Sequence, residues 1–376
     1  MATEQLTPRP SAVTDVDRMP VHGIDHLELF VGNAAQAAFF LTRAYGFAET
    51  AYAGLETGRR DRVSHVLEQG RIRLVVTGTL AGDDEIGEHH RRHGDGVRTV
   101  ALSVPDAVYA YEHAVAHGAR GLMTPHRAED EHGVVGLSSI ATYGDTRHLF
   151  VERSGYDGPF LPGFEARGDE HGGAGLFAGI DHVVGNVELG HMQEWVGYYE
   201  RVFGMTELIH FSDEAISTEY SALMSKVVID GSGRLKFPIN EPAEGKRKSQ
   251  IEEYLDFYRG AGVQHVALST TDIVGTVSEL RARGVDFLGI PEAYYDEVPG
   301  RIGPIEQDLA DLRRLGILVD SDDEGYLLQI FTKPVGDRPT LFFEIIERHG
   351  ARGFGEGNFK ALFEAIEREQ ALRGNL

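Results

Sequence analysis

GAGVQHVALS, residues 260–269, decides the fold of this chain, because it repeats GDGVRTVALS at residues 94–103. Seven of the ten positions are identical, and one of the three differences places His265 where the first copy has Thr99. A repeat separated by more than 150 residues indicates a duplicated domain, and the length of 376 residues suits about two domains.

Two shorter matches extend the repeat, Gly23–His26 with Gly179–His182 and Leu149–Glu152 with Leu341–Glu344. The second half therefore offers His182, His265 and Glu344, and the first half offers His26, Thr99 and Glu152 at the positions that the repeat aligns. Two imidazoles and one carboxylate are the usual protein ligands of a mononuclear non-heme Fe(II) oxygenase, which leaves positions open for substrate and O2. The pattern predicts a metal centre in the second half and none in the first.

The immediate neighbours of these residues favour metal binding over ordinary burial. Glu344 lies within the apolar run LFFEII, residues 341–346, where an ionised carboxylate is costly unless it is paired or binds a metal. His265 and His182 also precede or interrupt apolar runs. The alternative, that all of these are structural groups of the repeat, does not explain why the second half gains the one histidine that completes a triad.

Composition excludes several functions. The formal net charge of −23 disfavours binding to nucleic acid or to an anionic membrane surface. The chain has no cysteine, residues 1–20 lack the apolar core of a signal peptide, and no apolar run approaches a membrane span. These features indicate a cytoplasmic soluble enzyme with a disordered tail at residues 1–20.

The order of expected elements indicates an α+β fold in which each half consists of two βαβββ modules that form an open half-barrel. The four modules are expected to begin with strands and then helices at 22–31 and 34–45, 97–104 and 106–117, 177–186 and 192–202, and 263–268 and 271–284. Further strands are expected at 62–67, 71–78, 134–143 and 148–153. We expect an N-terminal domain at 21–160, a linker at 161–176 and a catalytic domain at 177–376, which ends in an amphipathic lid helix at 358–373.

Several segments of the second half, in order, resemble the 4-hydroxyphenylpyruvate dioxygenase family of the vicinal-oxygen-chelate superfamily. They are DHVVGN (181–186), TEYSAL (218–223), FPINEP (237–242), KSQI (248–251), GVQH (262–265), LQIFTKP (328–334), FFEII (342–346) and GFGEGNF (353–359). The resemblance implies Fe(II) bound by His182, His265 and Glu344. It also implies conversion of 4-hydroxyphenylpyruvate and O2 to homogentisate and CO2 in tyrosine breakdown, by a homo-oligomer that is a dimer or a tetramer.

The resemblance also implies a substrate pocket, formed by Ser225, Asn240, Gln250, Gln329, Phe331, Phe342, Asn358 and Phe359. Phe331 and Phe359 are expected to hold the phenol ring between them. Gln329 and Phe359 are expected to be catalytic together with the three metal ligands. Ser225, Asn240 and Gln250 are expected to bind the phenolic hydroxyl. In a regular strand, Gln264 would point away from the metal because successive side chains alternate. We expect the terminal helix to close over the pocket and exclude water.

Three other functions remain open at the level of sequence. The nearest is 4-hydroxymandelate synthase, which shares the substrate, the metal and the triad but carries a smaller aliphatic residue where this chain has Phe359. A glyoxalase-type isomerase or an extradiol dioxygenase would use the same modules with other chemistry. A small-molecule binding or resistance protein is disfavoured, because such proteins often lack the metal ligands.

Overall fold

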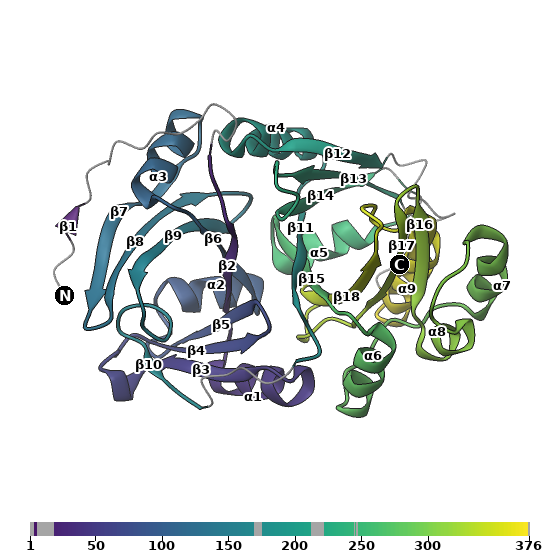
Figure 1. Cartoon of the computed structure of the whole chain (residues 1–376), viewed down its shortest axis with the longest axis horizontal. Helices are drawn as coiled ribbons and strands as arrows, with labels where there is room; N and C mark the ends of the chain where they lie inside the picture. Colours follow the sequence, from purple (N-terminus) through teal and green to yellow (C-terminus); the bar gives the residue numbers. More distant parts are fainter. Residues whose placement is uncertain are drawn as a thin grey trace.

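The computed structural model describes residues 4–5, 19–168, 175–211, 222–243, 245 and 247–374. It contains two curled sheets that lie side by side (Figure 1). The ten-stranded N-terminal sheet consists of β1 (Glu4–Gln5), β2 (Gly23–Phe30), β3 (Ala48–Ala53), β4 (Arg62–Gln69), β5 (Ile72–Thr79), β6 (Gly96–Ser103), β7 (Gly121–Asp130), β8 (Gly133–Ala141), β9 (Arg147–Tyr156) and β10 (Glu165–Ala166). The eight-stranded C-terminal sheet consists of β11 (Gly179–Asn186), β12 (Thr206–Phe211), β13 (Ala222–Ile229), β14 (Lys236–Ala243), β15 (Gly262–Ser269), β16 (Leu318–Asp322), β17 (Gly325–Phe331) and β18 (Phe342–His349).

Helices accompany both sheets (Figure 1), and the last of them packs against Phe331 and Phe342 of the second sheet. They are α1 (Ala34–Tyr45), α2 (Glu85–His93), α3 (Ala107–Ala116), α4 (Met192–Phe203), α5 (Gln250–Tyr258), α6 (Ile273–Ala282), α7 (Glu292–Arg301), α8 (Leu309–Leu315) and α9 (Phe359–Leu372), with short 3-10 turns at Leu55–Thr57 and Glu356–Asn358. The sequence predicted α1, α3, α4, α6 and α9, with capping residues or terminal glycines as signals for α3, α4 and α6 and apolar periodicity as the signal for α9. It did not predict α2, α5, α7 and α8.

Four modules repeat the same strand order, which confirms the predicted fold class. In each module the first strand pairs in parallel with the last, as β2 does with β5, β6 with β9, β11 with β14 and β15 with β18. The first strands of two modules then pair antiparallel, β2 with β6 and β11 with β15, so each sheet contains two modules. The paired modules place β11, β15 and β18 next to one another in the second sheet.

A carboxylate of the last strand bonds to the start of the helix in three of the four modules, and two of the three, Glu241 and Glu347, are buried. Glu152 accepts a hydrogen bond from the amide of Ala107 at the start of α3 (3.1 Å), and Glu347 accepts one from Ile273 at the start of α6 (2.7 Å). Glu241 does the same for the first amide of α4 (3.0 Å). Each carboxylate satisfies an amide that has no partner within its helix and carries a charge that the helix dipole favours.

This arrangement corrects one alignment made from the sequence. The register places Glu344 opposite Ala267 in β15, whereas Leu149 lies opposite Ala101, the equivalent residue of β6. Leu149 is therefore the structural counterpart of Glu344, and Glu152 is the counterpart of Glu347. The pairing of Glu152 with Glu344 was wrong by three residues, because a four-residue match of apolar residues ending in glutamate fits two registers of the same strand.

The tail and the linker are only partly described. The backbone of β1 pairs with β7, and the other residues of the predicted tail up to 18 lie outside the described residues. In the predicted linker, β10 pairs with β3 of the N-terminal sheet, and residues 169–174 lie outside the described part. Residues 218–221 of the TEYSAL segment also lie outside it. In the described part, no helix combines the length and the apolar character that a bilayer crossing requires.

Candidate metal centre and substrate pocket

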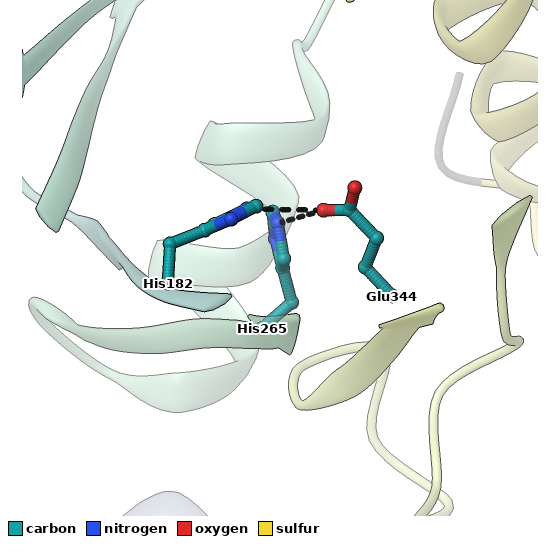
Figure 2. A group of neighbouring side chains, drawn as sticks. All are labelled: His182, His265 and Glu344. Atoms are coloured by element: carbon teal, nitrogen blue, oxygen red, sulfur yellow. Dashed lines mark ion pairs between the residues drawn. The ribbon is translucent and has the colours of Figure 1, made fainter. Parts of the chain in front are cut away.

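Three predicted ligands converge on one point from three adjacent strands (Figure 2). His182 lies on β11, His265 on β15 and Glu344 on β18. The Oε2 atom of Glu344 is 3.1 Å from Nε2 of His182 and 3.3 Å from Nε2 of His265. One potential ligand atom from each residue lies within 4.8 Å of the others, and the three side chains are almost fully buried.

β-bulges set the direction of both histidines. The pairing of β11 with β15 shifts between Ile180 and His182, and it shifts again where Val184 lies opposite His265. Each shift leaves one extra residue, Asp181 in the first case and Gln264 in the second, immediately before the histidine. A bulge breaks the alternation of side chains, so neighbouring residues can reach the same side of a strand.

The extra residue of each bulge bonds to the histidine that follows it. An Asp181 oxygen lies 2.8 Å from Nδ1 of His182, and Oε1 of Gln264 lies 3.0 Å from Nδ1 of His265. The expectation that Gln264 points away from the metal held only for a regular strand, and the bulge removes that condition, so that Gln264 contacts a candidate ligand. Both partner atoms are acceptors, so each Nδ1 carries the hydrogen and each Nε2 is directed at Glu344.

Charge and burial oppose each other at this site. Burial alone would raise the pKa of Glu344, but the positive character of His182 and the close contacts with both histidines lower it to about 2. Burial lowers the pKa of His265, and the nearby Glu344 only partly offsets that effect. For His182 the balance is reversed: burial disfavours the charged ring, yet Glu344 and Asp181 together raise its pKa. Glu344 is therefore an anion at neutral pH, as a metal ligand must be.

The donor set fits a divalent transition metal. Two imidazole nitrogens and one carboxylate oxygen approach each other without any other protein group between them, and each imidazole is already oriented through its second nitrogen. Imidazole and carboxylate together suit iron, whereas an all-oxygen set would suit magnesium or calcium. A metal at this point would replace the direct contacts of Glu344 with His182 and His265.

The cavity beside the triad contains most of the predicted pocket residues. Predicted residues that line it are Ser225, Asn240, Gln250, Gln329, Phe331, Phe342 and Phe359, together with the three metal-ligand candidates. Additional lining residues are Val184, Leu223, Val227, Pro238, Gln264, Phe354, Leu362, Phe363 and Ile366. Three of these, Leu362, Phe363 and Ile366, could have been found from the sequence. They follow Phe359 at helical spacing and belong to the predicted apolar face of the terminal helix.

Asn358 lies outside the lining of this cavity. Its Oδ1 atom accepts a hydrogen bond from the hydroxyl of Tyr294 (2.6 Å) and lies 3.5 Å from Nη2 of Arg301. The side chain is fully buried at the junction between the 3-10 turn and α9. The structure therefore places Asn358 where it anchors the start of the helix to α7.

Aromatic rings surround the metal ligands. Phe342 stacks on the ring of His265, with centroids 4.8 Å apart and planes 20° apart, and Phe331 meets the same ring edge-on at 5.9 Å. Phe354 contacts His182 edge-on at 5.1 Å. These rings fix both imidazoles and give the cavity apolar walls of the kind that a flat aromatic ligand favours.

In the N-terminal sheet the corresponding positions form a closed polar network. Thr99, the counterpart of His265, donates a hydrogen bond to Glu28 (2.9 Å) and accepts one from Arg147 (2.9 Å). Arg147 also forms an ion pair with Glu28 (3.2 Å). Two of the three donor positions are occupied by Thr99 and Leu149, so this half holds a different set of groups at the place of the triad.

Comparison with known proteins agrees with this geometry. Residues 23–143 and 179–298 match the model of the glyoxalase/bleomycin resistance protein/dioxygenase superfamily, so each half is a domain of that superfamily. The chain is 49% identical to 4-hydroxyphenylpyruvate dioxygenase of Dictyostelium discoideum, over 95% of this chain and 100% of the relative. It is 46% identical to the enzyme of the same name from Xenopus tropicalis, over 93% and 92% of the two chains.

A solved structure shows the same fold. A triple mutant of 4-hydroxymandelate synthase from Streptomyces coelicolor superimposes with a TM-score of 0.85, at 36% identity over 94% of this chain and 100% of that chain. Identities of 42–49% with curated dioxygenases, over nearly the full length of the chain, exceed this value. The chain belongs to the 4-hydroxyphenylpyruvate dioxygenase family.

Proposed function

We propose that this chain converts 4-hydroxyphenylpyruvate and O2 to homogentisate and CO2, with Fe(II) bound by His182, His265 and Glu344. The observation that carries the proposal is the convergence of these three side chains on one wall of an aromatic-lined cavity, in a chain of this family. Bound iron would supply the activation of O2 and a chelation point for the 2-oxo acid of the substrate.

The residues of the pocket divide into a polar group and an aromatic group. Ser225 lies opposite Asn240 in the pairing of β13 with β14, and Asn240 donates to Asn186 (3.3 Å). Gln250 is the first residue of α5, next to its cap Ser249. These three polar side chains would bind the phenolic hydroxyl at a distance from the metal. Gln329 and Phe331 lie on β17, the strand that pairs with the strand of Glu344.

The aromatic group would hold the ring and keep water out. Phe331 and Phe342 pack with Ala361, Ala365 and Ile366, so the inner face of α9 is part of the pocket wall. Phe359 and Phe363 pack with Leu223 and Ile251 on the other side. We propose that α9 acts as a lid, and that Asn358 fixes the base of this lid.

The same site could direct oxygen to a different carbon. The likeness to 4-hydroxymandelate synthase makes that enzyme the second candidate, since its product is an isomer of homogentisate with the oxygen on the benzylic carbon. The greater identity to dioxygenases and the presence of Phe359 favour ring hydroxylation.

Product analysis tests the proposal. Anaerobically purified protein is loaded with Fe(II) and incubated with 4-hydroxyphenylpyruvate and O2, and the product is identified by NMR and mass spectrometry. Homogentisate is the expected product. 4-Hydroxymandelate would replace the first candidate by the second, and absence of turnover in protein that holds iron would refute both. The variant Glu344→Gln is the control for iron-dependent turnover.

We also propose that the protein is a cytoplasmic homo-oligomer, either a dimer or a tetramer. The cysteine-free composition suits a reducing compartment. Light scattering coupled to gel filtration gives the oligomeric state, and a monomer across the working concentration range would contradict the proposal.

A further inference from the structure

Asp181 is the buried hub of a charge cluster directly behind the metal-ligand candidate His182. Its oxygens accept hydrogen bonds from Nε (2.8 Å) and Nη2 (2.9 Å) of Arg348, and both lie 3.3 Å from Nζ of Lys236. The remaining partner is Nδ1 of His182 at 2.8 Å. Two cations therefore hold one carboxylate in place, and that carboxylate holds the imidazole.

Arg348 links the same cluster to the loop that leads into α9. Its Nη1 atom donates to the carbonyl oxygens of Ala351 (3.2 Å) and Gly353 (2.6 Å). Its guanidinium also lies over the ring of Phe354, 5.4 Å from the centroid, and Phe354 in turn contacts the edge of His182. The imidazole is thus fixed both through Nδ1 and on one side of its ring.

The N-terminal half contains the same cluster without the triad. Asp25 lies 2.6 Å from Nδ1 of His26 and accepts hydrogen bonds from Arg153 at 2.7 and 2.8 Å. Arg73 takes the position of Lys236, at 3.8 Å, and Phe160 contacts the edge of His26 at 5.0 Å. The position of Glu344 is occupied by Leu149 in this half. The two clusters share their packing, so they differ mainly in whether a donor set lies in front of the histidine.

We propose that Asp181 is a positioning residue for the metal: it fixes the hydrogen of His182 on Nδ1 and thereby directs Nε2 to the metal ion. The inference rests on the proposed metal site. Partners of this kind orient a ligand and increase its basicity, and their loss typically weakens metal binding by about 10- to 100-fold. Asp25 forms the same contacts, so its loss should cost similar folding stability with no effect on the metal.

The matched pair Asp181→Asn and Asp25→Asn tests this. Co(II) and Zn(II) affinities are measured on full-length metal-free protein by absorbance titration and chelator competition, and urea unfolding gives the stability of each metal-free variant. We expect a loss of about 10- to 100-fold in affinity for Asp181→Asn and a change of less than about twofold for Asp25→Asn. Equal effects of the two substitutions, or no effect of the first, would overturn the inference and leave the metal site intact.

A measurement on the wild-type protein covers the case in which Asp181→Asn does not fold. Nitrogen-15 NMR of histidine-labelled, Zn(II)-loaded protein should show His182 protonated at Nδ1 and bound to zinc through Nε2. Zinc on Nδ1 would overturn the role of Asp181. Failure of the wild-type protein to bind either metal would refute the proposed metal site itself, and the inference with it.

Discussion

His148 should make the stability of this protein depend on pH in a measurable way. Its side chain is 1% exposed and lies between the halves, where it contacts Phe203 and Phe237. Nδ1 donates to the carbonyl of Val100 (3.1 Å), and Nε2 accepts from the hydroxyl of Tyr199 (2.9 Å) in the neutral ring. Burial lowers the pKa of His148 from 6.5 to about 4, although the hydrogen bond to Val100 opposes this shift.

The direction in which stability changes with pH follows from proton binding to the folded and unfolded chains. Between pH 4 and 6.5 the unfolded chain binds a proton at His148 and the folded chain does not. The stability from the neutral ring is therefore fully present above pH 6.5 and is lost as the pH falls toward 4. At pH 5 the loss is roughly 1.5 pH units multiplied by about 1.36 kcal/mol, or about 2 kcal/mol. His89, whose pKa burial lowers to about 3, adds a contribution of the same sign.

Urea unfolding of the metal-free wild type and of His148→Gln, at pH 7.5 and pH 5, measures this contribution. Glutamine retains one donor and one acceptor but does not titrate in this range. The variant should lose about 2 kcal/mol less than the wild type between the two pH values. Equal losses in the two proteins would refute the reasoning, because all other titrating groups are common to both.

Three further predictions concern the pocket and the contact between the halves. Glu344→Gln should abolish stoichiometric iron binding, as measured by elemental analysis; retention of iron would contradict the triad. Phe359→Val should shift the product toward 4-hydroxymandelate in NMR analysis, whereas unchanged homogentisate would show that this ring does not direct the oxygen. Arg338 donates to the carbonyls of Arg92 (2.7 Å) and Phe257 (3.2 Å) at the ends of α2 and α5. Arg338→Met should lower the free energy of unfolding by about 1–2 kcal/mol, and an unchanged urea midpoint would exclude that contribution.

The order of the modules and the metal triad could be predicted from the sequence. Capping residues and apolar periodicity mark the helices, and the internal repeat and its apolar neighbours mark the triad. Helices such as α1 and α6 begin at capping residues, Asn33 and Asp272, and follow an apolar period. The repeat placed His182 and His265 at equivalent first strands of their modules, and the buried setting of Glu344 was evident from its apolar neighbours. The polar pocket residues came only from the family resemblance, since Ser225 and Gln250 carry no signal of their own.

Register was the property that the sequence did not reveal. A bulge adds one residue to a strand without any strong sequence mark, so parity did not reveal the contact of Gln264 with His265. The slip of three residues at Glu152 was also an error of register, because strand pairing, and not local similarity, decides which residues share a position. Asn358 was assigned to the substrate by its place in a motif, and tertiary packing gives it to Tyr294 instead.

For protein engineering, the duplicated cluster around Asp25 makes the N-terminal barrel a scaffold for a second, designed metal centre. It already presents His26 with its Nδ1 atom held, as His182 is held in the natural site. Thr99→His and Leu149→Glu would supply the two missing donors, and Arg147 would have to be replaced as well, because it is hydrogen-bonded to Thr99 and paired with Glu28. A chain with two such centres would report, within one molecule, how much of the reactivity depends on the metal and how much on the pocket around it.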